Sequence, residues 1–167
     1  MFKKLLIVLL CAMPLSAFAQ YKFGNFNSQE IMSVMPERAA AEKTFSDFTK
    51  KYEDEFLKLR EEFDKKYKDF MATQDSLPEN IKTRRMQEVD ELQNRIRNFQ
   101  QIAQEDLEKK QQELYAPIQQ KLLDAIKAVG EEQKFTYIFD LAVPSIVYSG
   151  APSEDITPLL KAKLGIK

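Results

Sequence analysis

An apolar repeat of 11 residues runs through the long central part of the chain and limits what it can fold into. Residues 36–129 contain no glycine, and apolar side chains recur there every 11 residues. Eleven residues fill three turns at about 3.67 residues per turn, which predicts helices that are straight or coil slightly to the right. The repeats are Phe45, Phe56 and Tyr67; Phe48, Leu59 and Phe70; Tyr52 and Phe63; Ile96, Leu107, Ile118 and Val129; and Ile81, Leu92, Ala103 and Leu114.

A break near residue 76 divides this segment into two arms. Ser76 and Glu79 have the spacing of a capping box, and Pro78 is tolerated in a first helical turn. One helix is therefore expected to end near residue 73 and another to begin at residue 77. An antiparallel hairpin then aligns apolar residues in one register, and Tyr67 meets Arg85 in a cation–π pair. The expected apolar pairs are Phe45–Leu107, Phe48–Ala103, Tyr52–Phe99, Phe56–Ile96, Leu59–Leu92, Phe63–Val89 and Phe70–Ile81.

Shorter elements flank the hairpin. Residues 21–27 alternate in polarity as a strand does, and residues 28–35 predict a short helix with Ser28 as its N-cap. Two further strands are expected within residues 135–149, and a final helix that ends at Gly165. Strands so few and short do not form a stable independent sheet, so we expect this part to oligomerise through its strands.

The expected fold class is α+β, mostly α, with a long antiparallel helical hairpin (a coiled-coil arm) that projects from a small oligomeric β body. Residues 20–38 and 117–167 would form the β body with its short helices. Residues 39–116 would form the arm, with its tip near residues 74–78. Helical periodicity resumes after Pro117, which favours a kink over a stop and makes Pro117 the hinge candidate.

Residues 1–19 have the pattern of a secretory signal peptide. Lys3 and Lys4 precede an apolar run, and Ala17-Phe18-Ala19 forms an A-x-A cleavage site. The apolar run is shorter than the roughly 20 residues that span a membrane. We expect cleavage after Ala19 and export to the periplasm, with a retained membrane anchor as the alternative.

Composition argues against several classes of function. The chain has no histidine, and its one cysteine, Cys11, lies in the expected signal peptide, so we expect no metal, no cofactor and no enzyme activity. Loss of Lys3 and Lys4 leaves 23 basic residues of the original 25 against 26 acidic ones, a net charge of about −3. That balance lacks the basic face that a nucleic-acid binder needs.

Two groups of side chains are candidates for contact with partners. The aromatic stripe of the first helix could bind client polypeptides, although residues at this spacing usually form a core. A basic cluster beyond the arm tip could contact a client or a membrane surface, although a solvated helix face is the alternative. The stripe is Phe45, Phe48, Tyr52, Phe56, Phe63, Tyr67 and Phe70; the cluster is Lys82, Arg84 and Arg85.

The order and spacing of these segments resemble the Skp/OmpH family of periplasmic chaperones. The segments that carry the resemblance are Lys22–Ile31, the charged hairpin, Ala116-Pro117-Ile118, Tyr137-Ile138-Phe139-Asp140, Ile146-Val147-Tyr148 and Asp155-Ile156-Thr157. The resemblance implies a homotrimer whose three arms hold unfolded outer-membrane proteins without ATP. Better-known members are strongly basic, whereas this chain is slightly acidic, so a lipopolysaccharide site is not carried over. The alternative is an exported coiled-coil structural or adaptor protein that binds a folded envelope partner.

Overall fold

The computed structural model describes residues 21–166 and divides them into two units. Residues 32–122 form one unit, and residues 21–31 with 123–166 form the other. We call them the hairpin unit and the sheet unit and describe each by itself. The expected signal peptide lies outside the described residues. None of the described helices is both long and apolar enough to cross a membrane.

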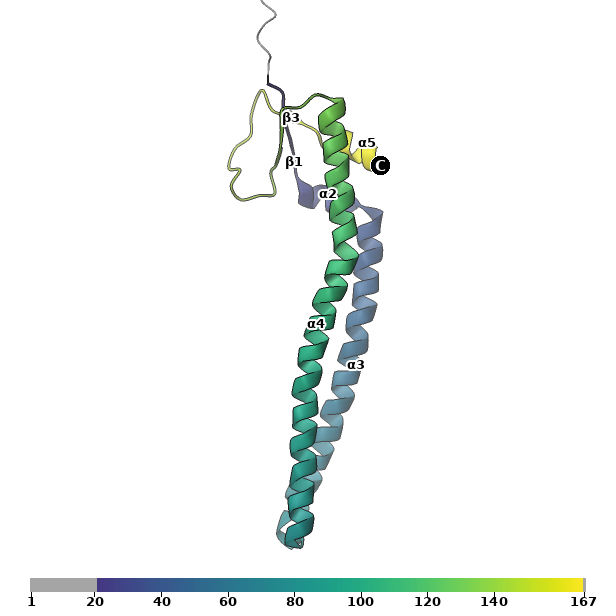
Figure 1. The fold of residues 1–167 in the computed structure, drawn as a ribbon, viewed down its shortest axis with the longest axis vertical. Coiled ribbons are helices and arrows are strands. Elements are labelled where there is room, and N and C mark those ends of the chain that lie inside the picture. The colour runs from purple at the N-terminus through teal and green to yellow at the C-terminus, as the bar shows by residue number, and fades with distance from the viewer. Residues whose placement is uncertain (1–20, 167) are drawn as a thin grey trace, which may run out of the picture. The chain divides into compact units, whose positions relative to one another are not determined.

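The hairpin unit is built from α3 (Pro36–Thr73) and most of α4 (Glu79–Glu132), which run side by side in opposite directions (Figure 1). The 38 residues of α3 span about 57 Å at about 1.5 Å per residue. A single turn of 3-10 helix, η1 (Gln74–Ser76), and an extended Leu77 connect the two helices. The predicted long antiparallel hairpin is confirmed. Pro117 does not end α4, which continues through it to Glu132.

The predicted capping box at the start of α4 is wrong. The hydroxyl of Ser76 donates to the carbonyl of Thr73, at 2.9 Å, instead of capping the second helix. The first helical acceptor is the Pro78 carbonyl, which receives the N–H groups of Ile81 and Lys82 at 2.9 Å. Proline disfavours helical dihedrals at the residue before it, and Leu77 is extended with φ −85° and ψ 141°. The helix therefore begins at Glu79 and not at residue 77.

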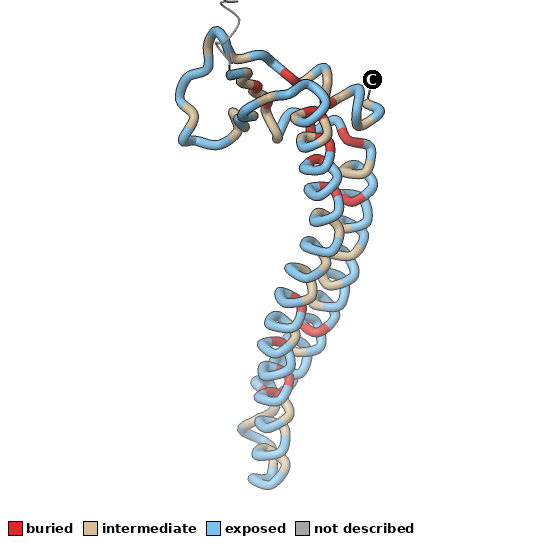
Figure 2. Tube along the Cα trace, turned by 45° about the horizontal axis from the view of Figure 1, so that its top comes forward, coloured by how far each residue is buried: buried red, intermediate tan, exposed pale blue. Residues whose placement is uncertain are grey.

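Buried residues lie along the sides of the two helices that face each other, as the red positions in Figure 2 show. The rings of Tyr52 and Phe99 lie 5.8 Å apart between centroids, which is one of the pairs that the register predicted. A two-helix layer covers only one stripe of each helix, so the outer faces stay charged and exposed. The buried residues of the hairpin unit are Met35, Ala41, Leu59, Phe70, Val89, Leu92, Ile96, Ala103, Ile118 and Leu122.

The sheet unit contains three short parallel strands. Central β1 (Phe23–Phe26) pairs with β2 (Tyr137–Asp140) on one side and with β3 (Glu154–Asp155) on the other. A strand at residues 145–149 was predicted, and this is wrong. Val147 and Tyr148 are 93% and 85% exposed, in an irregular segment. Parallel strands need a crossover connection, and this segment carries the chain across to the far edge of β1.

Two short helices lie wholly or partly in the sheet unit. The short helix α2 (Ser28–Val34) is capped by Asn27, whose Oδ1 accepts the N–H of Glu30 at 3.1 Å, so Ser28 is not the N-cap that we predicted. Helix α5 (Thr157–Leu164) ends at Gly165, which adopts the left-handed conformation (φ 71°) of a typical C-cap. The buried apolar residues of the sheet unit are Phe26, Ile31, Ala125, Val129, Ile156 and Leu160.

The Asp140 carboxylate connects the end of β2 to the start of α2. Its Oδ1 accepts the backbone N–H groups of Ser28 and Ala142, both at 2.9 Å. Burial acts to raise the pKa of Asp140, but the hydrogen bonds from Ser28 and Ala142 outweigh it and hold the pKa below its ordinary value. The charged carboxylate therefore stabilises this junction.

Candidate functional site

The aromatic stripe lies along the seam of the hairpin unit. Phe70 is buried, Tyr67 is 44% exposed, and the other members are partly exposed at the edges of the seam. The structure thus uses the stripe as hairpin core while leaving parts of most rings open to solvent. Partly exposed members of the stripe are Phe45, Phe48, Tyr52, Phe56 and Phe63.

Ring contacts hold the stripe in place. Phe48 meets the edge of Tyr52 at 5.2 Å, and Phe63 stacks on Tyr67 at 5.8 Å. The expected Tyr67–Arg85 pair is not among the cation–π contacts of the described residues. In the hairpin unit, Lys110 lies over the ring of Phe48 instead, with its Nζ 5.9 Å from the ring centroid.

An apolar groove opens at the middle of the seam. It has a volume of about 370 Å³ and is formed by Tyr52, Phe56, Phe99, Ala103 and Leu107. The hydroxyl of Tyr52 donates to Asp106 Oδ2 at 2.6 Å. This bond to Asp106 raises the pKa of Tyr52, so the phenol stays protonated and the ring is held against α4.

Polar and charged side chains form the rim of this groove. They are Glu53, Gln100, Gln104, Glu108 and Gln111. Gln104 donates to Glu108 at 3.0 Å. The two charged residues that line the groove, Glu53 and Glu108, are both acidic. Periodicity located the aromatic wall of this groove, but it did not indicate the groove itself.

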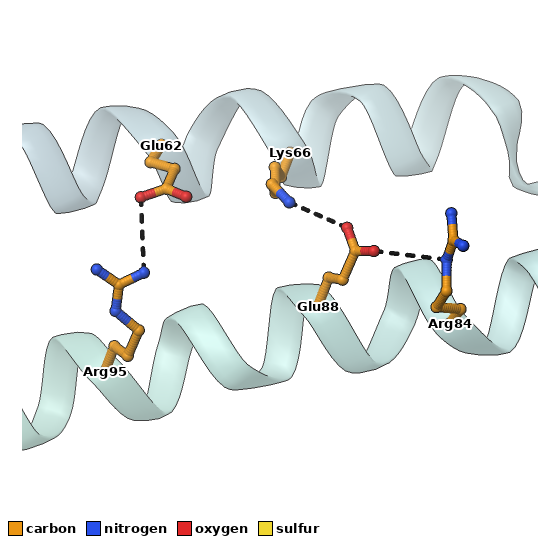
Figure 3. Close-up of polar contacts among 5 residues, drawn as sticks. All are labelled: Glu62, Lys66, Arg84, Glu88 and Arg95. Atoms are coloured by element: carbon orange, nitrogen blue, oxygen red, sulfur yellow. Dashed lines mark hydrogen bonds and ion pairs between the residues drawn. The ribbon is translucent and has the colours of Figure 1, made fainter.

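The predicted basic cluster is partly neutralised by α3 and α4 themselves. Figure 3 shows Glu88 between Lys66 and Arg84, with contacts of 3.0 Å and 3.6 Å, and a longer Glu62–Arg95 pair at 3.9 Å. The hydrogen bond from Lys66, with smaller effects of the nearby arginines, lowers the pKa of Glu88. Arg84 therefore belongs to an ion-pair network, while Lys82 and Arg85 are partly exposed beside it.

A second aromatic group, on the sheet unit, was not proposed from the sequence. Phe23 lies 6.3 Å from both Tyr137 and Phe139, and Tyr21 lies 6.5 Å from Phe23. Tyr21, Tyr137 and Phe139 are 68%, 61% and 40% exposed. We call these four residues the aromatic row. The alternation of apolar and polar residues predicted that Tyr21 and Phe23 lie on one side of a strand. No short-range sequence pattern indicates the parallel strand pairing that adds Tyr137 and Phe139.

Residues 21–166 contain no group of three or more histidine, cysteine, aspartate or glutamate side chains placed to bind a metal ion. The notable features of the described chain are therefore surfaces: a half-open aromatic seam, its acidic-rimmed groove and the aromatic row.

Two comparisons with known proteins found matches to this chain, one to a family and one to a solved structure. A family profile described as outer membrane protein (OmpH-like) matches residues 22–164. A crystal structure from Caulobacter crescentus CB15, described as a candidate outer membrane chaperone (OmpH-like), superposes with a TM-score of 0.72 at 19% identity. That match covers 87% of this chain and 85% of the other, and at this identity it shows the shared fold. Among curated protein sequences, none matches significantly.

Proposed function

Because the chain belongs to the OmpH-like family, we propose that it is a periplasmic, ATP-independent holding chaperone for unfolded outer-membrane β-barrel proteins. The observation that carries this proposal is the half-open aromatic seam of the hairpin. An unfolded barrel exposes alternating apolar side chains, and partly exposed rings along a rigid helix pair offer them many weak contacts. The proposal assigns no catalytic residue.

The proposed hold depends on several contacts acting together. Each partly exposed ring, such as Phe45 or Phe56, presents too little area for tight binding alone. Contacts on linked sites add through the high effective concentration of the second and later ones. Release then needs no ATP, because each weak contact can open separately. The tip cluster of Lys82, Arg84 and Arg85 could add electrostatic contact with acidic clients or a membrane surface.

We further propose a homotrimer that assembles through the sheet unit. The sheet has three strands, two of them are edges, and three rings of the aromatic row, those of Tyr21, Tyr137 and Phe139, are exposed. Exposed edges and apolar rings favour association with another copy. Three hairpins would then surround one client. The number three comes from the family resemblance.

Native mass spectrometry of residues 20–167, with and without a urea-diluted outer-membrane barrel protein, tests this proposal. We expect a trimer that gains one unfolded client, together with slower light scattering from the aggregating barrel. A monomer or dimer that ignores the client, with unchanged aggregation, would refute both the assembly and the holding role.

The alternative is a coiled-coil adaptor that binds one folded envelope partner. The burial of Phe70 and the ion pairs along the hairpin favour it, since they describe a stable two-helix rod. The range of clients separates the two functions. A chaperone should slow the aggregation of several unrelated unfolded barrels, whereas an adaptor should bind one folded protein and none of the barrels.

A further inference from the structure

We infer that the groove over Ala103 is a docking site for one large apolar side chain of an unfolded polypeptide, preferred when a lysine or arginine lies next to it in the client. The inference rests on the proposed holding function and gives it a specific contact point. It follows from four features of the groove: its origin, the rigidity of its walls, its size and the sign of the charge on its rim.

The groove exists because one position of the 11-residue repeat is small. The ladder on α4 reads Ile81, Leu92, Ala103 and Leu114, so a methyl group stands where its neighbours carry branched four-carbon side chains. Ala103 is only 9% exposed, so it lies between the helices and not on the outer face. A missing side chain at a buried position leaves space that neighbouring residues fill only in part.

The walls of the groove are formed before any ligand binds. Tyr52 is held by its hydrogen bond to Asp106 and by ring contacts with Phe48 and Phe99. Both helices are continuous through this region. A preformed site loses little conformational entropy on binding, which favours even a small contact.

The size of the groove suits a side chain. Its volume of about 370 Å³ lies near the lower limit of ligand pockets, which run from about 300 to 1,000 Å³. A single phenylalanine, leucine or tyrosine of an extended chain can enter it, while the rest of the client remains outside.

The rim decides which apolar side chains are preferred. Glu53 lies on α3 and Glu108 on α4, so carboxylates from both helices line the groove. Among the described residues that line it, these two are the charged ones, and the remaining polar ones are glutamines. The nearby Lys110 pairs with Glu113 at 3.1 Å. A client cation beside the inserted side chain would find complementary charge here, and a client carboxylate would be repelled.

The test uses the chain of residues 20–167 and three fluorescent peptides in a serine–glycine background. One carries phenylalanine between two lysines, one phenylalanine between two glutamates, and one alanine between two lysines. Fluorescence anisotropy should give the order Phe–Lys, then Phe–Glu, with Ala–Lys the weakest. Equal binding of the first two peptides would overturn the role of the rim.

Variants of the protein assign the binding to this groove. Ala103→Leu restores the large apolar side chain of the repeat. Circular dichroism should show that the helices stay folded, and the affinity for the Phe–Lys peptide should fall by at least about tenfold. Ala72→Leu, at an exposed position of α3, is the matched control and should bind as the parent does. Unchanged binding by folded Ala103→Leu would overturn the proposal.

Charge reversal tests the rim by itself. Glu53→Lys with Glu108→Lys should exchange the preference, so that the Phe–Glu peptide binds more tightly than the Phe–Lys peptide at low salt. Glu61→Lys with Glu91→Lys, which changes the same charge at exposed positions outside the groove, should keep the original order. An exchanged preference in both double variants would mean that net charge alone steers the peptides, and would overturn the site.

The same samples separate this inference from the proposed function. If the parent chain does not slow the aggregation of an unfolded barrel, the holding function itself fails. If the parent holds the barrel while Ala103→Leu binds the Phe–Lys peptide equally well, only the groove fails. If Ala103→Leu changes the oligomeric mass by native mass spectrometry, the groove is occupied by a second copy of this chain, which also overturns the proposal.

Discussion

The hairpin unit and the sheet unit use aromatic side chains in opposite ways. In the hairpin unit, rings such as Tyr52 and Phe99 pack between two helices of the same chain. In the sheet unit, Tyr21, Tyr137 and Phe139 face outward. One face of the sheet is well covered: Phe26 is buried, and added atoms at Gly24 would meet Ile156 and Phe135. The other face is covered only in part, where the segment after β2 borders Phe23 and Phe139.

The difference teaches which unit is complete by itself. Two helices with one apolar stripe each can bury those stripes against one another, so a hairpin needs no second chain to form its seam. A three-stranded sheet with a row of exposed rings leaves apolar surface without a partner. We therefore expect assembly to depend on the sheet unit and client contact to depend on the hairpin unit.

The largest expected effect comes from removing most of the hairpin. Deletion of residues 42–110 should abolish client holding while the remaining chain keeps its number of subunits, because the strands and the aromatic row are retained. Native mass spectrometry and light scattering of an aggregating barrel measure the two properties. If the oligomer disappears together with the holding activity, the two-part architecture is wrong.

Core substitutions should affect the two units unequally. Leu160→Ala should lower the free energy of unfolding by about 2–5 kcal/mol, because Leu160 is fully buried. Leu59→Ala should cost about 2 kcal/mol, near the lower end of that range, since the flanks of the hairpin are open. Urea unfolding measures both, and hydrogen exchange shows which unit opens first. Val147→Ala, at a 93% exposed position, is the control, and a loss there as large as for Leu160→Ala would contradict the core assignment.

Asp140 should make the sheet unit sensitive to acid. The pKa of Asp140 in the folded chain lies below its ordinary value of about 3.8, so its stabilising effect is complete above that ordinary value. The effect is lost as the pH falls through the lower pKa of the folded state. Asp140→Asn should therefore unfold more easily at neutral pH and lose less stability on acidification. Thermal melts of both proteins between neutral pH and acid measure this difference in stability. If the stability of the variant and of the parent falls in parallel as the pH is lowered, the role assigned to Asp140 is contradicted.

The smallest expected effect concerns the ion pairs in Figure 3. Glu88→Gln removes contacts to both Lys66 and Arg84, whereas Glu62→Gln removes one long contact to Arg95. Both losses in the free energy of unfolding should be small, because exposed ion pairs contribute little, and the loss for Glu88→Gln should be the larger. Chemical unfolding at low and high salt should show the difference shrinking as salt screens the pairs. If Glu62→Gln loses more unfolding free energy than Glu88→Gln, these side chains act through packing and not through their ion pairs.

Short-range sequence patterns predicted the hairpin because helix formation and turns depend mainly on residues close together in the chain. The 11-residue repeat indicated two helices, and one antiparallel register included the Tyr52–Phe99 contact. The same reasoning misplaced the start of α4, because Pro78 restricts Leu77 more strongly than Ser76 favours a cap. It also predicted a strand around Val147, where the apolar pattern of Ile146-Val147-Tyr148 is outweighed by the need for a crossover.

The sequence by itself determined the long helices, their turn and the aromatic stripe, since periodicity and proline act within a few residues. The tertiary structure decided which residues complete the candidate sites. The aromatic row requires the pairing of Phe23 with Tyr137, more than a hundred residues away. The groove requires Glu53 of α3 and Glu108 of α4 to line the same opening as the small Ala103. Such juxtapositions depend on strand register and helix packing, which short-range patterns in one sequence do not specify.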